Sequence, residues 1–139
     1  MEISRLQPAG LVRSPAFSHV AIVPPGAATI YVGGQNGVDE TGSVISSDVA
    51  EQSRRAVDNC SVALEAAGAT LADVVQWTVF ISADADLGAA YGAIAPRLAT
   101  GGAPPLVTAA LVAGLGVPGA LIEVSAIAAV LPQNGETRR

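Results

Sequence analysis

The sequence predicts a single α/β domain of the α+β type, in which two helices cover one face of a mixed sheet. Two segments, beginning near Asp48 and near Asp86, repeat apolar residues at helical spacing. Runs rich in β-branched and aromatic residues lie before, between and after these segments. The predicted order is strand, strand, a possible short strand, helix, strand, helix, strand, strand. Two helices suffice to cover only one face of such a sheet.

The chain has 139 residues, which suits one domain with a core of its own. We interpret residues 1–16 as an N-terminal arm, residues 17–131 as the domain and residues 132–139 as a polar tail. Phe17–Val23 and Thr29–Gly34 flank a turn of two prolines and a glycine. That arrangement predicts a β-hairpin.

The clearest helix is predicted to begin at Asp48, a good N-cap, with Glu51 three residues later as in a capping box. Gly68 is expected to end this helix. A short strand over Ser43–Ser46 is predicted just before it. The apolar stripe of the helix consists of Val49, Ala56, Val57, Cys60, Ala63, Leu64 and Ala67.

Val74–Ile81 alternates apolar and polar residues and is predicted to be a strand. A second helix is expected from Asp84 or Asp86 to about Ala99. Pro96 should kink or shorten that helix, because proline removes a backbone donor from the helix interior.

The last two predicted strands, Leu106–Ala113 and Ala120–Val130, are apolar on both sides. A sheet that is apolar on both faces is normally buried on both, and no third helix is predicted. Charged residues make up 14% of the chain, against about a quarter in average soluble proteins. We therefore expect further copies of the chain to cover the second face.

Composition argues against nucleic-acid and membrane partners. The net charge is −5, and the seven cationic side chains are scattered arginines, whereas nucleic-acid binding needs clustered cations. The apolar segment 103–130 is broken well short of the roughly 20 residues of a membrane-spanning helix. The N-terminus lacks a signal-peptide pattern, and Cys60 is the only cysteine. The cytoplasm is the expected compartment.

Glu123 is the one ionisable residue in the apolar segment and the first candidate for chemistry. It either points to solvent near a sheet edge, or serves as a general acid/base or water-orienting carboxylate in a partly dry pocket. His19 has no partner motif and Cys60 lies on an apolar stripe, so we interpret both as structural. Gly33–Gly37 matches no phosphate-binding pattern. It forms either a sharp turn or the lining of a small-molecule cleft.

Several motifs are shared with a known family. IYVGGQNGVDETG, DVAEQSRRAVDNCSVALEAAGATLADVVQWTVFI and LIEVSAIAAV resemble, in that order, the Rid (YjgF) family of small deaminases. The resemblance runs from Phe17 to Val130. It implies a chorismate-mutase-like domain that assembles as a homotrimer with clefts between subunits. Members hydrolyse imines and enamines to ketoacids and ammonia without a metal or cofactor, and some have been described as ribonucleases.

The resemblance also implies roles for particular residues. Gly34 and Gln35 match the cleft residues after the second strand, and Glu123 matches the carboxylate that positions the attacking water. The small residue that follows an arginine–serine pair in the family falls near Thr108.

Three positions depart from the family pattern. Leu106 stands where the family has the arginine that binds the substrate carboxylate, Phe17 replaces a tyrosine, and Tyr91 replaces an asparagine. Leucine cannot replace a bidentate cationic clamp, so a neutral or more hydrophobic ligand is expected at the cleft. Whether Arg13 or Arg97 reaches the cleft is left open by the sequence.

Two functions of different class follow from these observations. The first is hydrolysis of a small imine-, enamine- or carbonyl-like metabolite, with Glu123 orienting water and with Phe17, Leu106 and Tyr91 as walls of the cleft. The second is a small-molecule-binding or scaffold trimer of the same fold without catalysis. Endoribonuclease activity is a distant third, because an acidic chain without lysine is poorly suited to phosphates.

Overall fold

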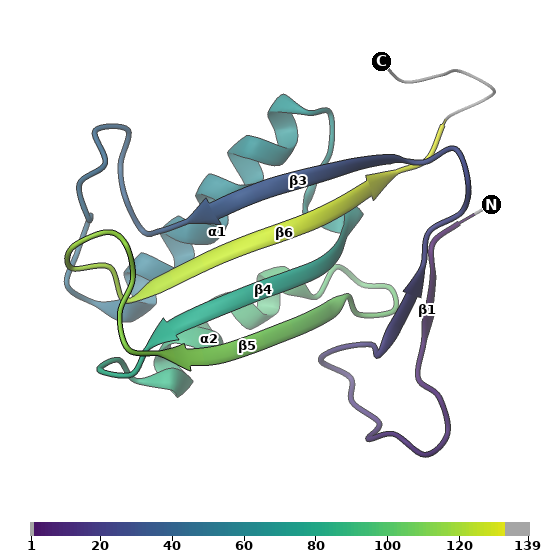
Figure 1. Cartoon of the computed structure of the whole chain (residues 1–139), viewed down its shortest axis with the longest axis horizontal. Coiled ribbons are helices and arrows are strands. Elements are labelled where there is room, and N and C mark those ends of the chain that lie inside the picture. Colours follow the sequence, from purple (N-terminus) through teal and green to yellow (C-terminus); the bar gives the residue numbers. More distant parts are fainter. Residues whose placement is uncertain (1, 133–139) are drawn as a thin grey trace.

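A four-stranded mixed sheet and two helices form the body of the protein (Figure 1). The structure is a computed structural model and describes residues 2–132. In spatial order the strands are β3 (Ala28–Gln35), β6 (Ile122–Val130), β4 (Val74–Ser82) and β5 (Leu106–Val112). β6 runs antiparallel to both of its neighbours, and β4 and β5 are parallel. The prediction of two helices on one face of a mixed sheet is confirmed.

Helix α1 (Val49–Ala66) begins and ends as its sequence predicts. The Asp48 side chain accepts a hydrogen bond from the backbone N–H of Glu51, which satisfies one of the free donors of the first turn. At the other end Gly68 has a φ of 79°. The backbone N–H groups of Gly68 and Ala69 donate to the carbonyls of Glu65 and Leu64 respectively. These two bonds form a Schellman motif, in which glycine is favoured because of its positive φ.

Helix α2 (Leu87–Leu98) takes Asp86, not Asp84, as its N-cap, with the Asp86 side chain accepting from the N–H of Ala89. Pro96 lies inside this helix. The missing donor falls in the last turn, so the helix ends two residues later rather than breaking in its middle.

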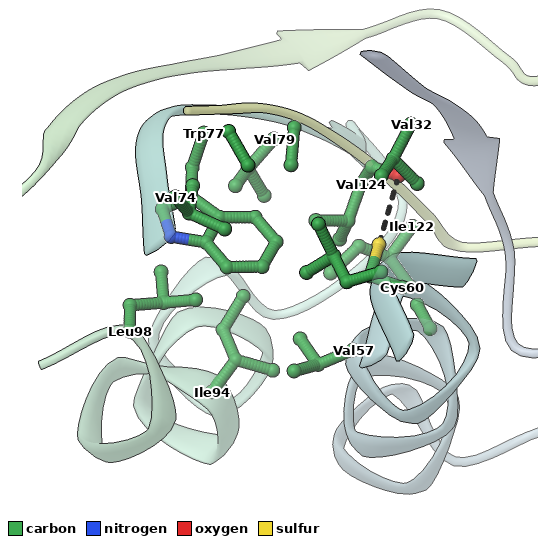
Figure 2. Packing of buried hydrophobic residues seen from close by; sticks show 14 of the residues in the cluster. Val32, Val57, Cys60, Val74, Trp77, Val79, Ile94, Leu98, Ile122 and Val124 are labelled. Carbon is green, nitrogen blue, oxygen red and sulfur yellow. Dashed lines mark hydrogen bonds between the residues drawn. The ribbon is translucent and has the colours of Figure 1, made fainter. Parts of the chain in front are cut away.

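The core lies between the sheet and the two helices (Figure 2). Trp77 and Val79 of β4 and Ile122 and Val124 of β6 point toward the helices, where Cys60 is fully buried. The alternation predicted for β4 is confirmed, because every second side chain from Trp77 to Ile81 is fully buried while Thr78 and Phe80 are only half-buried.

The hairpin predicted for the first two strand-like runs is wrong. β2 (Val20–Ile22) pairs antiparallel with β1 (Ser4–Leu6), and the two form a separate sheet beside the body (Figure 1). β3 pairs with β6 instead. The predicted N-terminal arm therefore contains a strand. The short strand predicted at Ser43–Ser46 is reduced to one bridge, between Val38 and Val44.

One face of the four-stranded sheet is open. β3, β6 and β4 turn Tyr31, Ile127 and Gln76 to this face at matching register positions, opposite to the helices. Tyr31 is 76% exposed. Cover of this face by other copies stays a prediction.

Within residues 2–132 no helix is long and apolar enough to cross a membrane. The predicted polar tail lies, apart from Pro132, outside the described residues.

Candidate functional site

The open face of the sheet places Glu123 directly against Gly34. β6 carries Glu123 between the core residues Ile122 and Val124, so its side chain points away from the helices. The pairing of β3 with β6 shifts register between Val32 and Gln35, and Gly34 lies in that irregularity. An ideal Cβ at Gly34 would lie 2.7 Å from both Cδ and Oε2 of Glu123. The carboxylate therefore occupies the space that a side chain at position 34 would need.

The Glu123 side chain is half-buried. Among residues 2–132 its carboxylate has no hydrogen-bond or ion-pair partner. Its cross-strand neighbour on β4 is Phe80, which shares the open face. A carboxylate in this setting has its lone pairs available for a water molecule or a ligand.

Two buried amides hold the loops on either side of this carboxylate. The Asn36 side chain donates to the carbonyl of Ile122 at 2.8 Å. Gln52 of α1 accepts from the N–H of Leu121 at 2.8 Å and donates to the carbonyl of Gly119 at 3.2 Å. Neither residue was predicted from the sequence, although Gln52 falls on the apolar stripe of α1, where a polar residue signals a buried hydrogen bond.

Gln35 lies apart from Glu123. Its Nε2 donates to the carbonyl of Gly33 at 3.2 Å. It lines a separate hollow of about 300 Å³ over α1, together with Asp39, Arg55 and Asn59 among others. The structure therefore brings Gly34, but not Gln35, to the carboxylate.

Phe17 and Tyr91 line the same cavity, which has a volume of about 630 Å³. The cavity lies between α2 and β5, on the helix side of the sheet. Its lining consists of Ala16, Phe17, Leu87, Gly88, Tyr91, Gly92, Val107 and Ala109. Burial raises the pKa of the Tyr91 phenol above its ordinary value, so this hydroxyl stays protonated.

Neighbouring polar groups hold Phe17 in the wall of this cavity. Gln7 donates to the carbonyl of Phe17 at 2.6 Å, and Ser18 is bonded through both N–H and hydroxyl to the two prolines that precede β5. The His19 ring meets the Phe17 ring edge-on at 5.4 Å, while its Nε2 bonds the carbonyl of Val12. These contacts give His19 a structural role.

Leu106 and Thr108 lie outside this cavity. They pair with Gln76 and Thr78 of β4 and share the open face with them. The β5 residues that line the cavity are Val107 and Ala109, neither of which was predicted as a site residue. Because side chains alternate between the two faces of a strand, the sequence alone places Leu106 and Thr108 on one face of β5 and Val107 and Ala109 on the other.

Arg13 and Arg97 do not line the cavity. Arg97 forms a salt bridge with Asp58 and donates to the carbonyl of Arg54. Arg13 is exposed, and no bond to another residue between 2 and 132 engages its side chain. In the same range no group of three His, Cys, Asp or Glu side chains is placed to hold a metal ion.

A mixed four-stranded sheet with two helices on one face defines the class: a small α+β domain of the chorismate-mutase-like type. The family model described as Endoribonuclease L-PSP matches residues 11–130. The chain belongs to this family, which is also known as the Rid (YjgF) family.

Solved structures of the family agree with this fold. A Rid-family protein from Yersinia pestis has a TM-score of 0.79 and 26% identity, with 94% of this chain and 100% of that chain covered. The YjgF gene product of E. coli has a TM-score of 0.62 and 31% identity, with 76% of this chain and 83% of that one covered.

Matches to curated relatives are shorter. A RutC family protein of Pyrococcus abyssi is 45% identical over 53 residues, which is 37% of this chain and 42% of the relative. The human 2-iminobutanoate/2-iminopropanoate deaminase is 40% identical over 55 residues, which is 39% of this chain and 40% of the relative. The chain thus spans about two fifths of the length of these relatives.

Proposed function

We propose that the protein is a cofactor-independent hydrolase of small imines or enamines, acting in clefts between the subunits of a homotrimer. The observation that carries this proposal is the Glu123 carboxylate, which is half-buried, lies against Gly34 and has no partner among residues 2–132. The names of the human and rat relatives, both 2-iminobutanoate/2-iminopropanoate deaminases, support the same chemistry.

The cleft would need more than one copy of the chain. Glu123 and Leu106 share the open face, but they are separated by two strand spacings and by four residues along the strands. These offsets amount to about 10 Å and about 13 Å. A small substrate cannot touch both in one chain. A second copy packed on the open face would bring the Glu123 of one subunit toward the β5 edge of another.

The reaction needs only water as a co-reactant. The oxygen of a water held by Glu123 forms a bond to the imine carbon, while the carboxylate takes up a proton from that water. Glu123 then passes that proton to the imine nitrogen, which gives a carbinolamine with a hydroxyl and an amino group on one carbon. The hydroxyl proton next moves through Glu123 to the amino nitrogen as the C–N bond breaks, which leaves a carbonyl compound, ammonia and the original carboxylate. Gly34 contributes the space, and its backbone amide a polar contact.

The test compares wild type with Glu123→Gln while an oxidase generates imines in the same solution and ammonia release is followed. The amide keeps the size but not the basicity of the carboxylate. We expect the protein-dependent rate to fall by about 100-fold. Glu65→Gln, on the exposed side of α1, is the matched control. A rate equal to that of wild type in Glu123→Gln would refute the role of this carboxylate.

The variant Leu106→Arg distinguishes the hydrolase from the alternative, a binding or scaffold protein without catalysis. This variant restores the cation that the family uses for a substrate carboxylate. Hydrolysis of amino-acid-derived imines in Leu106→Arg, with no activity in wild type on any imine, would favour the scaffold. Activity of wild type on a neutral imine would favour the hydrolase.

A further inference from the structure

We infer that the cavity between α2 and β5 binds an uncharged ligand group of about the size of an aromatic ring. Taken together with the proposed function, on which this second step rests, the inference names the substrate class: imines of primary amines that carry an aryl or bulky alkyl group and no carboxylate. The ring would lie in the cavity of one copy, while Glu123 of another copy, brought to the β5 edge, would face the imine carbon.

The shape and lining of the cavity support an apolar occupant. Its volume of about 630 Å³ lies within the roughly 300–1,000 Å³ of small-molecule pockets. Phe17, Leu87 and Val107 provide ring and branched aliphatic surface. The Tyr91 hydroxyl is the one polar side-chain group of the lining, and among residues 2–132 it has no hydrogen-bond partner. It can therefore donate to a carbonyl or imine nitrogen of the ligand.

Two glycines of α2 widen the cavity. Gly88 and Gly92 are one helical turn apart, and both line it. Glycine in a helix costs roughly 1 kcal/mol relative to alanine, so a packing or functional reason is expected. Packing does not explain the glycine at position 92, because an ideal Cβ there would meet nothing within 4 Å. At Gly88 the first contact is Asp86 at 3.4 Å, an ordinary distance. The missing side chains leave room for a ligand.

The charges around the cavity disfavour an anion. No arginine is among the lining residues, and Arg97 on the same helix is bound to Asp58. The N-terminal end of α2, which would otherwise attract an anion, is already capped by the Asp86 carboxylate. A substrate carboxylate would therefore lose its hydration here without gaining a counter-ion.

For such a substrate the balanced reaction is R–CH=NH + H₂O → R–CHO + NH₃. The imine itself would come from a two-electron oxidation of a primary amine. The class of reaction that supplies this substrate is therefore amine oxidation, and reactions that consume aldehydes would follow it.

The first test measures binding without turnover. 2-Phenylethanol and phenylacetate, a ring without and with a carboxylate, are titrated into the full-length protein by calorimetry. We expect 2-phenylethanol to bind at least about tenfold more tightly than phenylacetate. Gly92→Leu, which places a side chain in the cavity, should weaken the binding of 2-phenylethanol by about tenfold. Ala89→Leu, on the exposed surface of α2, should leave that binding unchanged. Tighter binding of phenylacetate, or unchanged binding in Gly92→Leu, would overturn the inference.

Folding and assembly are checked in the same proteins. Gly92→Ala should melt at the wild-type temperature or above, because alanine favours the helix. If Gly92→Leu fails to fold, Gly88→Leu replaces it as the filling variant. Loss of oligomers in Gly92→Leu with unchanged 2-phenylethanol binding would show that the cavity is a subunit contact, and would overturn the inference.

A turnover measurement then distinguishes a failure of the proposed cavity ligand from a failure of the proposed hydrolase function. With an amine oxidase and 2-phenylethylamine we expect ammonia release that depends on Glu123. Specific binding of 2-phenylethanol without any such hydrolysis would uphold the apolar site and refute the hydrolase. Hydrolysis restricted to imines of amino acids would uphold the hydrolase and refute the proposed substrate class.

Discussion

Gly34 and Glu123 fit together because the glycine has no side chain: a Cβ at position 34 would lie within 3.0 Å of three atoms of the glutamate side chain. The adjacent Gly33 has nothing within 4 Å of its own Cβ position. Of these two neighbouring glycines, therefore, Gly34 alone has a Cβ position that meets the carboxylate. Substitutions at the two positions can thus distinguish an effect on Glu123 from an effect on the strand.

Gly34→Ala should displace the Glu123 carboxylate while the strand persists, because the end of a glutamate side chain can move more cheaply than backbone. We expect imine hydrolysis to fall by about 100-fold, the usual effect of a misplaced catalytic group, with little change in melting temperature. Gly33→Ala is the control and should keep wild-type activity. Equal rates in the two variants would mean that the position of the carboxylate does not matter.

Gly37→Ala should destabilise the fold rather than the site. A Cβ at Gly37 would lie 2.6 Å from the Cα and the carbonyl oxygen of Gln52, and backbone atoms cannot swing aside. Because the Gln52 side chain also holds Gly119 and Leu121, the strain reaches the loop before β6. We expect a loss of about 1–3 kcal/mol in the free energy of unfolding by urea.

Gly116→Ala serves as the control for this measurement, since its Cβ position is open and its φ is not positive. A loss of stability as large in Gly116→Ala as in Gly37→Ala would contradict the steric argument.

Local sequence signals predicted the helices and the long strands, because caps and periodicity act within a few residues. Asp48 and Gly68 mark the ends of α1 through their own backbone bonds. The pairing of β2 could not be predicted in this way. A turn with two prolines suggested a hairpin with β3, yet the partner of β2 is a three-residue strand in the N-terminal arm. Such a choice depends on contacts between distant segments.

The candidate site was predictable in part, for the same reason. The apolar setting singled out Glu123, and the resemblance added Gly34, which the structure places beside it. Leu106 was expected to share a wall with Phe17, but the pleat of β5 turns it to the other face. Asn36 was missed because its partner, the carbonyl of Ile122, lies 86 residues away in the sequence.

Cys60 predicts a distinct pH dependence of stability. Burial raises the pKa of its thiol from 9.0 to about 12, against a smaller opposing effect of Arg97. The unfolded chain releases this proton at lower pH than the folded protein does. The contribution of the neutral thiol is therefore complete below pH 9 and is lost progressively between pH 9 and about pH 12.

Urea unfolding of wild type and Cys60→Ala at pH 7 to 11 checks this. Alanine leaves a cavity that lowers the free energy of unfolding by an amount that does not depend on pH. The comparison therefore concerns only the slopes of the free energy of unfolding against pH. Above pH 9 wild type should lose up to about 1.4 kcal/mol per pH unit more than the variant. Parallel curves would show that the thiol is not shielded from solvent.

The open face of the sheet leads to a last prediction, which concerns the assembly of several copies of the chain. Tyr31 and Ile127 are cross-strand partners on this face, and Tyr31 is 76% exposed. Specific interfaces bury about 800 Å² per partner, somewhat over half of it apolar, and each Å² of apolar surface contributes about 25 cal/mol. Cover of this face would thus contribute about 10 kcal/mol per partner, of which several kcal/mol remain after the entropy cost of association. A buried, unpaired carboxylate would cancel much of that gain.

We therefore expect wild type to sediment as a trimer at micromolar concentration, and Tyr31→Glu and Ile127→Glu to shift it toward monomers. Val62→Glu, at a 67% exposed position on α1, adds the same charge to the opposite side and should leave the trimer intact. Because the proposed cleft needs Glu123 from one copy and β5 from another, imine hydrolysis should fall in parallel with the trimer fraction. A monomeric wild type with full activity would refute both the assembly and the shared cleft, since one chain cannot bring these two groups together.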